Sequence, residues 1–105
     1  MSITFGSPGT PPPIPVIMGA PQYTMLVPNT GNALALTVPT GATHALVTND
    51  SLDGILRWTY GSPNPTATTG HIIQAGTTVE LDNITMLRFF ANKTNVYMQV
   101  SYRHY

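Results

Sequence analysis

The amino-acid sequence predicts an all-β protein, a single antiparallel β-sandwich or jelly roll of about eight short strands with an extended Pro-rich N-terminal arm. Ten prolines and nine glycines among 105 residues interrupt the chain too often for long helices. Sixteen threonines favour extended, half-exposed strands. Short runs of alternating apolar and polar residues, bounded by turn residues, are typical of strands with one buried face.

Composition divides the chain into two parts. Eight of the ten prolines lie in residues 1–39, and no Asp, Glu, Lys or Arg occurs before Asp50. Residues 6–15 contain five prolines, which fix φ and lack an N–H donor, so this stretch cannot form a helix or a central strand. We therefore predict an extended arm over residues 1–32 and a β-sandwich domain over residues 33–105.

The expected strands follow the alternation and the turn residues between the runs. We expect them at 33–38, 43–48, 55–60, 71–74, 78–82, 85–90 and 95–103, with one more at 23–27. The last run shows the alternation most clearly, since its apolar positions recur at every second residue: Val96, Met98, Val100 and Tyr102.

The arm is apolar and uncharged, which would make it prone to aggregation if it were exposed to water. We therefore expect it to lie against protein, either by wrapping its own domain or by reaching a neighbouring subunit.

Charge excludes several classes of function. The net charge is zero, with four Lys and Arg against four Asp and Glu, so a basic nucleic-acid-binding surface is not expected. Only 8% of the residues are charged, where about a quarter is usual. A free-standing soluble monomer usually keeps its net charge away from zero, so the net charge of zero indicates a surface that a partner covers. We see no signal peptide and no apolar run long enough to span a membrane. The chain has no cysteine, so neither disulfides nor thiolate chemistry are possible.

The groups that could support catalysis are few. The four carboxylates are Asp50, Asp53, Glu80 and Asp82, and the three histidines are His44, His71 and His104. No two histidines have a metal-ligand spacing, and Ser51 lacks the surroundings of a nucleophile elbow. The sequence therefore predicts no enzyme, no cofactor and no metal site.

One aromatic pattern leaves two interpretations open. Arg57, Trp58 and Tyr60 lie on one expected strand, and Trp58 and Tyr60 share a face of it. If exposed, the two rings would form a stacking platform for a sugar; if buried, they belong to the sandwich core.

Several segments resemble small virion-associated proteins of tailed bacteriophages and prophages. The segments are residues 33–47, 55–60, 65–76 and 96–102, and the Pro-rich arm lies outside the resemblance. Such proteins are similar to the β-sandwich or jelly-roll cement (decoration) proteins, which sit as trimers on capsids and reinforce the joints of the shell.

The resemblance implies a structural virion protein on the capsid exterior, made in the host cytoplasm. It implies a homotrimer that binds the major capsid protein, with no nucleic-acid or membrane partner. On this interpretation the arm makes the contacts, through Phe5, Ile14, Val16, Ile17, Met18, Tyr23 and Met25. The alternative is a virion carbohydrate- or receptor-binding module that uses Arg57, Trp58 and Tyr60.

Overall fold

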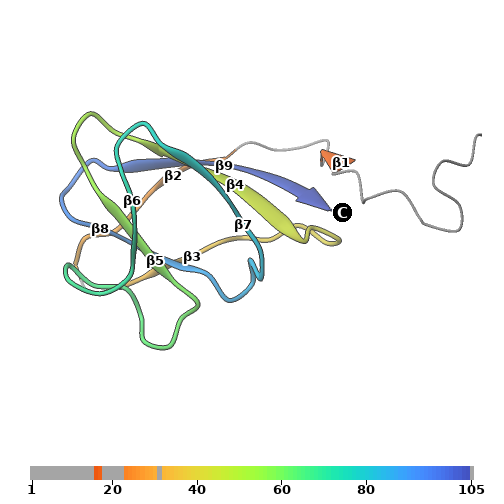
Figure 1. Cartoon of the computed structure of the whole chain (residues 1–105), viewed down its shortest axis with the longest axis horizontal. Helices are drawn as coiled ribbons and strands as arrows, with labels where there is room; N and C mark the ends of the chain where they lie inside the picture. The colour runs from red at the N-terminus through yellow and green to blue at the C-terminus, as the bar shows by residue number, and fades with distance from the viewer. Residues whose placement is uncertain (1–15, 18–22, 31, 105) are drawn as a thin grey trace, which may run out of the picture.

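The structure of this chain is a computed structural model, which describes residues 16–17, 23–30 and 32–104. These residues form two antiparallel β-sheets packed face to face (Figure 1). The first, sheet A, contains β1 (Val16–Ile17), β2 (Tyr23–Leu26), β4 (His44–Asp50), β7 (Thr78–Leu81) and β9 (Tyr97–His104). The second, sheet B, contains β3 (Leu34–Ala35), β5 (Leu56–Thr59), β6 (His71–Ile73) and β8 (Arg88–Ala91). Within the described ranges, no helix is long and apolar enough to cross a membrane.

The strand pairing is that of a jelly roll. Four strands from β2 to β5 pair in turn with the four strands that run back from β9 to β6: β2 with β9, β3 with β8, β4 with β7 and β5 with β6. The pairs alternate between the two sheets, because β9 also pairs with β4 and β8 also pairs with β5. This is a long antiparallel hairpin folded over into two layers. The predicted all-β sandwich is confirmed.

Strand β9 holds the N-terminal strands in place. Strand β4 pairs with β9 from Tyr97 to Arg103 and so occupies one of its edges almost completely. Strands β1 and β2 therefore share the other edge, where β2 pairs with residues 97–100 and β1 with residues 103–104. Figure 1 shows β1 beside the C-terminal end of β9. The sandwich thus includes residues 23–26, which the sequence analysis assigned both to the arm and to a strand.

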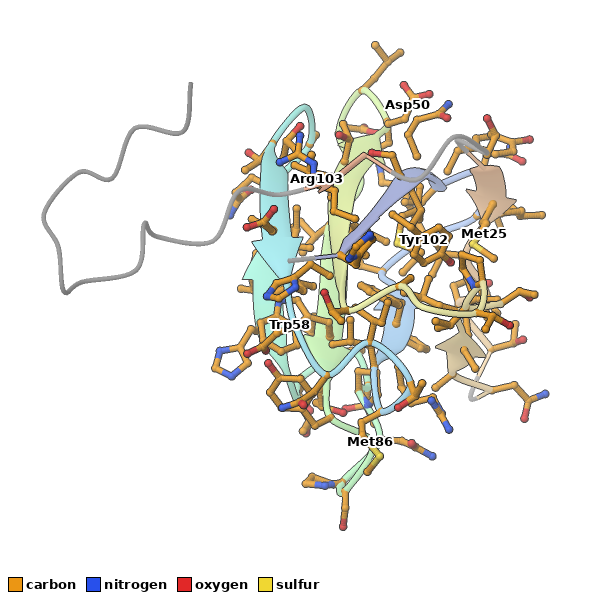
Figure 2. The ribbon with its side chains drawn as sticks, turned by 90° about the vertical axis from the view of Figure 1, so that its right-hand side faces the viewer. Met25, Asp50, Trp58, Met86, Tyr102 and Arg103 are labelled. Carbon is orange, nitrogen blue, oxygen red and sulfur yellow. The ribbon has the colours of Figure 1, made fainter. Side chains whose placement is uncertain are left out.

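The core lies between the two sheets and is built by the predicted alternation. On β9 the residues Met98, Val100 and Tyr102 are buried, while the residues between them are half-buried. Figure 2 shows Tyr102 between the layers, on the same side of the sandwich as Met25. The remaining buried apolar side chains come from both sheets and from the loops, among them Val27, Val47, Leu56, Ile73, Leu87 and Phe89.

Three expected elements differ from the structure. The run at 33–38 is a strand only at Leu34–Ala35, where β8 offers a pairing partner. The run at 85–90 begins with a turn, because Asn83 has a positive φ and its carbonyl accepts the N–H of Met86, so β8 starts at Arg88. Strand β1 lies within the segment expected as an unpaired arm, and its pairing with β9 has no local signal in the sequence.

A buried asparagine organises the loop between β4 and β5. Asn49 is fully buried, and its side-chain amide donates to the carbonyl oxygens of Gly54 and Ile73, both at 2.9 Å. Its side-chain oxygen accepts a 2.7 Å hydrogen bond from Ser51. The Asn49 side chain therefore links the end of β4 in sheet A to β6 in sheet B, and both of its polar atoms have hydrogen-bond partners.

Replacing Asn49 by Ala should therefore destabilise the protein more than other polar substitutions in this loop. The change leaves two buried carbonyl groups and the Ser51 hydroxyl without this partner, at an expected cost of about 2–4 kcal/mol. Urea denaturation of Asn49→Ala measures this cost, with Asp53→Ala in the same loop as the control, since Asp53 makes only a solvent-exposed ion pair. Equal stabilities of the two variants would contradict the assigned role of Asn49.

Candidate functional site

The structure describes only part of the predicted arm interface. Phe5, Ile14 and Met18 lie outside the described residues. Val16 and Ile17 form β1, and Tyr23 belongs to β2. Met25, also in β2, is half-buried and packs against the core of its own sandwich.

The outer face of sheet A carries a polar row that crosses four strands. Thr24, Gln99, Thr48 and Thr78 are register neighbours on β2, β9, β4 and β7. The Thr24 hydroxyl donates to the side-chain oxygen of Gln99 at 2.8 Å. The hydroxyls of Thr48 and Thr78 lie 2.7 Å apart. These cross-strand bonds hold uncharged hydrogen-bonding groups in fixed positions on an open sheet face.

Apolar side chains lie on both sides of this polar row. On one side Leu26 and Tyr97 are register partners, and they are 55% and 40% exposed. On the other side Leu46 and Ser101 are register partners and line a hollow of about 150 Å³ with members of the polar row. We call this the outer A surface and define it by its uncharged residues: Thr24, Leu26, Leu46, Thr48, Thr78, Tyr97, Gln99 and Ser101.

Sequence analysis did not identify the outer A surface, although the sequence contains part of the pattern that defines it. The alternation in 43–48 and 95–103 already separates inner from outer residues on each strand. It does not give the register between strands that are far apart in the sequence, and that register brings Thr24 beside Gln99.

Each of the four carboxylates of the chain has a partner within it. Glu80 lies 3.2 Å from Arg103, and Asp53 lies 2.7 Å from Lys93. Asp50 accepts a hydrogen bond from Gln99 at 3.0 Å, and Asp82 accepts one from Tyr60 at 2.7 Å. The described residues contain no group of three or more His, Asp or Glu side chains that could hold a metal ion.

The aromatic residues form a cluster at the rim of the sandwich. Trp58 is half-buried and packs against the core, so it lies on the inner face of sheet B. Its ring meets Tyr60 edge to face at 5.3 Å between centroids, and His71 in a tilted arrangement at 4.6 Å. The indole is therefore largely engaged with the protein's own residues, which leaves Tyr60 and His71 as the exposed members of the cluster.

Arg57 does not join this cluster. Because side chains alternate along β5, Arg57 lies on the opposite face of sheet B from Trp58. Its guanidinium donates to the carbonyl oxygen of Gly70 at 3.0 Å and so fixes the loop before β6. The structure thus brings Trp58 and Tyr60 together, as the sequence analysis expected, and separates Arg57 from both.

The chain was compared with models of protein families, with curated proteins and with solved structures, and none of them matches.

Trp58→Ala should destabilise the protein by about 2 kcal/mol, somewhat less than the loss of a fully buried tryptophan. The expected cause is the loss of packing against the core and against His71. Urea denaturation gives the free energy of unfolding, with Ile72→Ala on the exposed face of β6 as the control. A loss below about 0.5 kcal/mol would show that the indole is not part of the core.

The Tyr60–Asp82 hydrogen bond gives a second test of this cluster. Donation to Asp82 is the largest cause that raises the pKa of Tyr60 above its ordinary value of 10.0, followed by partial burial and the negative charge of Asp82. The contribution of this bond to folding is therefore present below pH 10 and is lost as the pH rises through the raised pKa. Asp82→Asn should lower the pKa of Tyr60 in an NMR titration of its ring carbons. Asp53→Asn, which changes a carboxylate that is paired with Lys93, should leave the pKa of Tyr60 unchanged.

Proposed function

We propose that the protein is a structural component of a phage virion, a capsid cement or decoration protein. In this role it binds the outside of the shell and stabilises it by joining neighbouring subunits of the major capsid protein. The arm and the outer A surface make the contacts, and no residue has a catalytic role. The engagement of all four carboxylates within the chain supports a non-catalytic protein.

The register of β1 is the observation that carries the proposal. Val16 pairs with His104, so the N-terminal segment meets sheet A at the C-terminal end of β9. Residues 1–15 precede this pairing in the sequence. Those fifteen residues are uncharged and include Ile3, Phe5 and Ile14. A neighbouring subunit is the partner that we infer for these apolar side chains.

The chemistry of the outer A surface fits a protein partner. Its own hydrogen-bonding groups are neutral, and two carboxylates border it, Asp50 beside Tyr97 and Glu80 beside Leu46. Gln99 donates to Asp50, and Arg103 pairs with Glu80. The exposed Leu26 and Tyr97 supply apolar area beside the polar row.

The alternative, a virion carbohydrate- or receptor-binding module, draws less support from the geometry. It needs an open aromatic ring, and Trp58 packs against the core and two neighbouring rings. It also needs Arg57 near that ring, and Arg57 lies on the opposite face of its sheet.

The proposal is tested by co-sedimentation of the purified protein with capsids of the phage that encodes it, prepared without this protein. The full chain should bind and should raise the temperature at which the capsids release their contents. The double variant Phe5→Asp, Ile14→Asp should bind at least about 100-fold more weakly, because each lost apolar contact of this size contributes about 1.5–3 kcal/mol.

The matched control is Ile72→Asp, which places the same charge on an exposed apolar position of sheet B. This variant should bind capsids like the unmodified protein. Failure of the unmodified protein to bind would refute the cement function, and equal binding by the double variant would remove the arm from the contact.

A further inference from the structure

We propose that a hollow between the β2–β3 and β8–β9 loops binds one ring of a neutral saccharide. The hollow has a volume of about 290 Å³ and is lined by residues 26–30 on one side and by Thr94 and Asn95 on the other. We call it the loop hollow. It shares no residue with the Trp58–Tyr60 cluster, and Figure 1 shows the β8–β9 loop at the end of the sandwich opposite the C-terminus. The proposal goes beyond the capsid role and does not depend on it.

The loop hollow opens where the chain crosses from sheet A to sheet B after β2. Val27 still pairs with β9, since its N–H donates to the carbonyl oxygen of Val96 at 3.0 Å. Pro28 already pairs with the end of β8, since its carbonyl oxygen accepts the N–H of Ala91 at 3.0 Å. The β2–β3 loop therefore leaves β9 at this point, and residues 94–95 of the β8–β9 loop form the facing wall.

Contacts outside the loop hollow hold the β8–β9 loop in place. The side-chain oxygen of Asn92 accepts the N–H of Ile55 at 2.8 Å, and the N–H of Asn92 donates to the carbonyl oxygen of Ile55 at 3.0 Å. The next residue, Lys93, lies 2.7 Å from Asp53. Both walls are thus fixed by hydrogen bonds before a ligand arrives, which lowers the ordering cost of binding.

The polar side chains of the loop hollow are not engaged within the protein. Asn29, Thr30, Thr94 and Asn95 make no side-chain hydrogen bond to any residue that the structure describes. Each of these amides and hydroxyls both donates and accepts hydrogen bonds. A sugar hydroxyl also does both, so adjacent hydroxyls of one ring match groups that face each other across the two loops.

The rest of the lining favours a neutral ligand with an apolar face. Leu26, which also belongs to the outer A surface, is 55% exposed, and Pro28 is half-buried. These side chains offer C–H surface to the face of a ring, while the polar groups reach its edge. No lining residue is charged, and Lys93 beside Thr94 is paired with Asp53. An anionic ligand would therefore find no free cation among the lining residues.

The size of the loop hollow suits one sugar ring. A cavity of about 150 Å³ holds a benzene ring, so a volume of about 290 Å³ accommodates a pyranose with its hydroxyl groups. A bound peptide would instead require an extended groove or an open sheet edge. At the efficiency typical of ordinary ligands, a molecule of about a dozen non-hydrogen atoms binds with a Kd in the low millimolar range.

NMR titration of the ¹⁵N-labelled full chain tests this site. D-glucose, D-galactose, D-mannose and N-acetyl-D-glucosamine are added separately, each to about 100 mM, well above the expected Kd. We expect at least one of them to shift the side-chain amide signals of Asn29 and Asn95 in a saturable manner, with a Kd of about 1–10 mM.

Asn95→Gly should weaken this binding at least about tenfold, because it removes one hydrogen-bonding side chain from the site. Glycine readily adopts the φ of 60° found at Asn95, so the substitution preserves the backbone. The matched control is Asn83→Gly, which makes the same change at a residue with a φ of 46° before β8 rather than after it. The control should bind the sugar with an unchanged Kd. If Asn95→Gly does not fold, Thr94→Val removes a hydroxyl from the same wall.

Three results would overturn the proposal. In the first, none of the four sugars produces saturable shifts. In the second, the saturable shifts are confined to the signals of Trp58, Tyr60 and His71, which would place the sugar on the aromatic cluster. In the third, the variant of the β8–β9 loop binds as tightly as the control. No capsid is present in these titrations, so their outcome is distinct from a failure of the proposed function.

Discussion

The register of β9 is the constraint on which the rest of sheet A depends. One edge of β9 pairs with β4, and the other pairs with both strands of the N-terminal segment. Its inward residues, such as Met98 and Val100, fill the core, while Gln99 between them belongs to the outer A surface. A slip of one residue would exchange the two sets and bury polar groups. The core and the candidate interaction surface are therefore fixed by the same pairing.

Periodicity predicted most of this fold because each sheet has one face toward the core. Alternation located the strands at 43–48, 55–60 and 95–103 to within three residues at their ends, and Gly, Pro and Asn located the turns. Alternation and turn residues do not give the pairing between strands that are distant in the sequence. Strand β1 is two residues long and pairs with residues nearly the whole chain away, so no local pattern marks it. In the sequence, Asn49 cannot be told from other turn residues, because its burial depends on a hydrogen bond to the Ile73 carbonyl oxygen in the other sheet.

The candidate site was predictable only in part, for the same reason. The sequence correctly placed Trp58 and Tyr60 on one face and left open whether that face is core or platform. The answer depends on His71 and the core beneath it, which pack on Trp58 through tertiary contacts. A jelly roll by itself is compatible with many functions, so the fold does not decide between them. The surface is more informative, since the outer A surface combines fixed uncharged hydrogen-bonding groups with exposed apolar side chains, and two carboxylates border it.

Strand β1 is two residues long and therefore a weak anchor for the N-terminal segment when it acts alone. This weakness suits the role proposed for the protein. A protein that assembles on a lattice must not bind its partners tightly while it is free, or it would aggregate before it reaches the shell. Several such anchors engaged together convert the later contacts into intramolecular ones, so the total affinity rises by orders of magnitude without a larger single interface. On the proposed function the uncharged arm would add to this property, because contacts made by apolar burial depend little on salt. On the proposed function, the scarcity of charge that first distinguished this sequence is the property that lets many weak contacts act together.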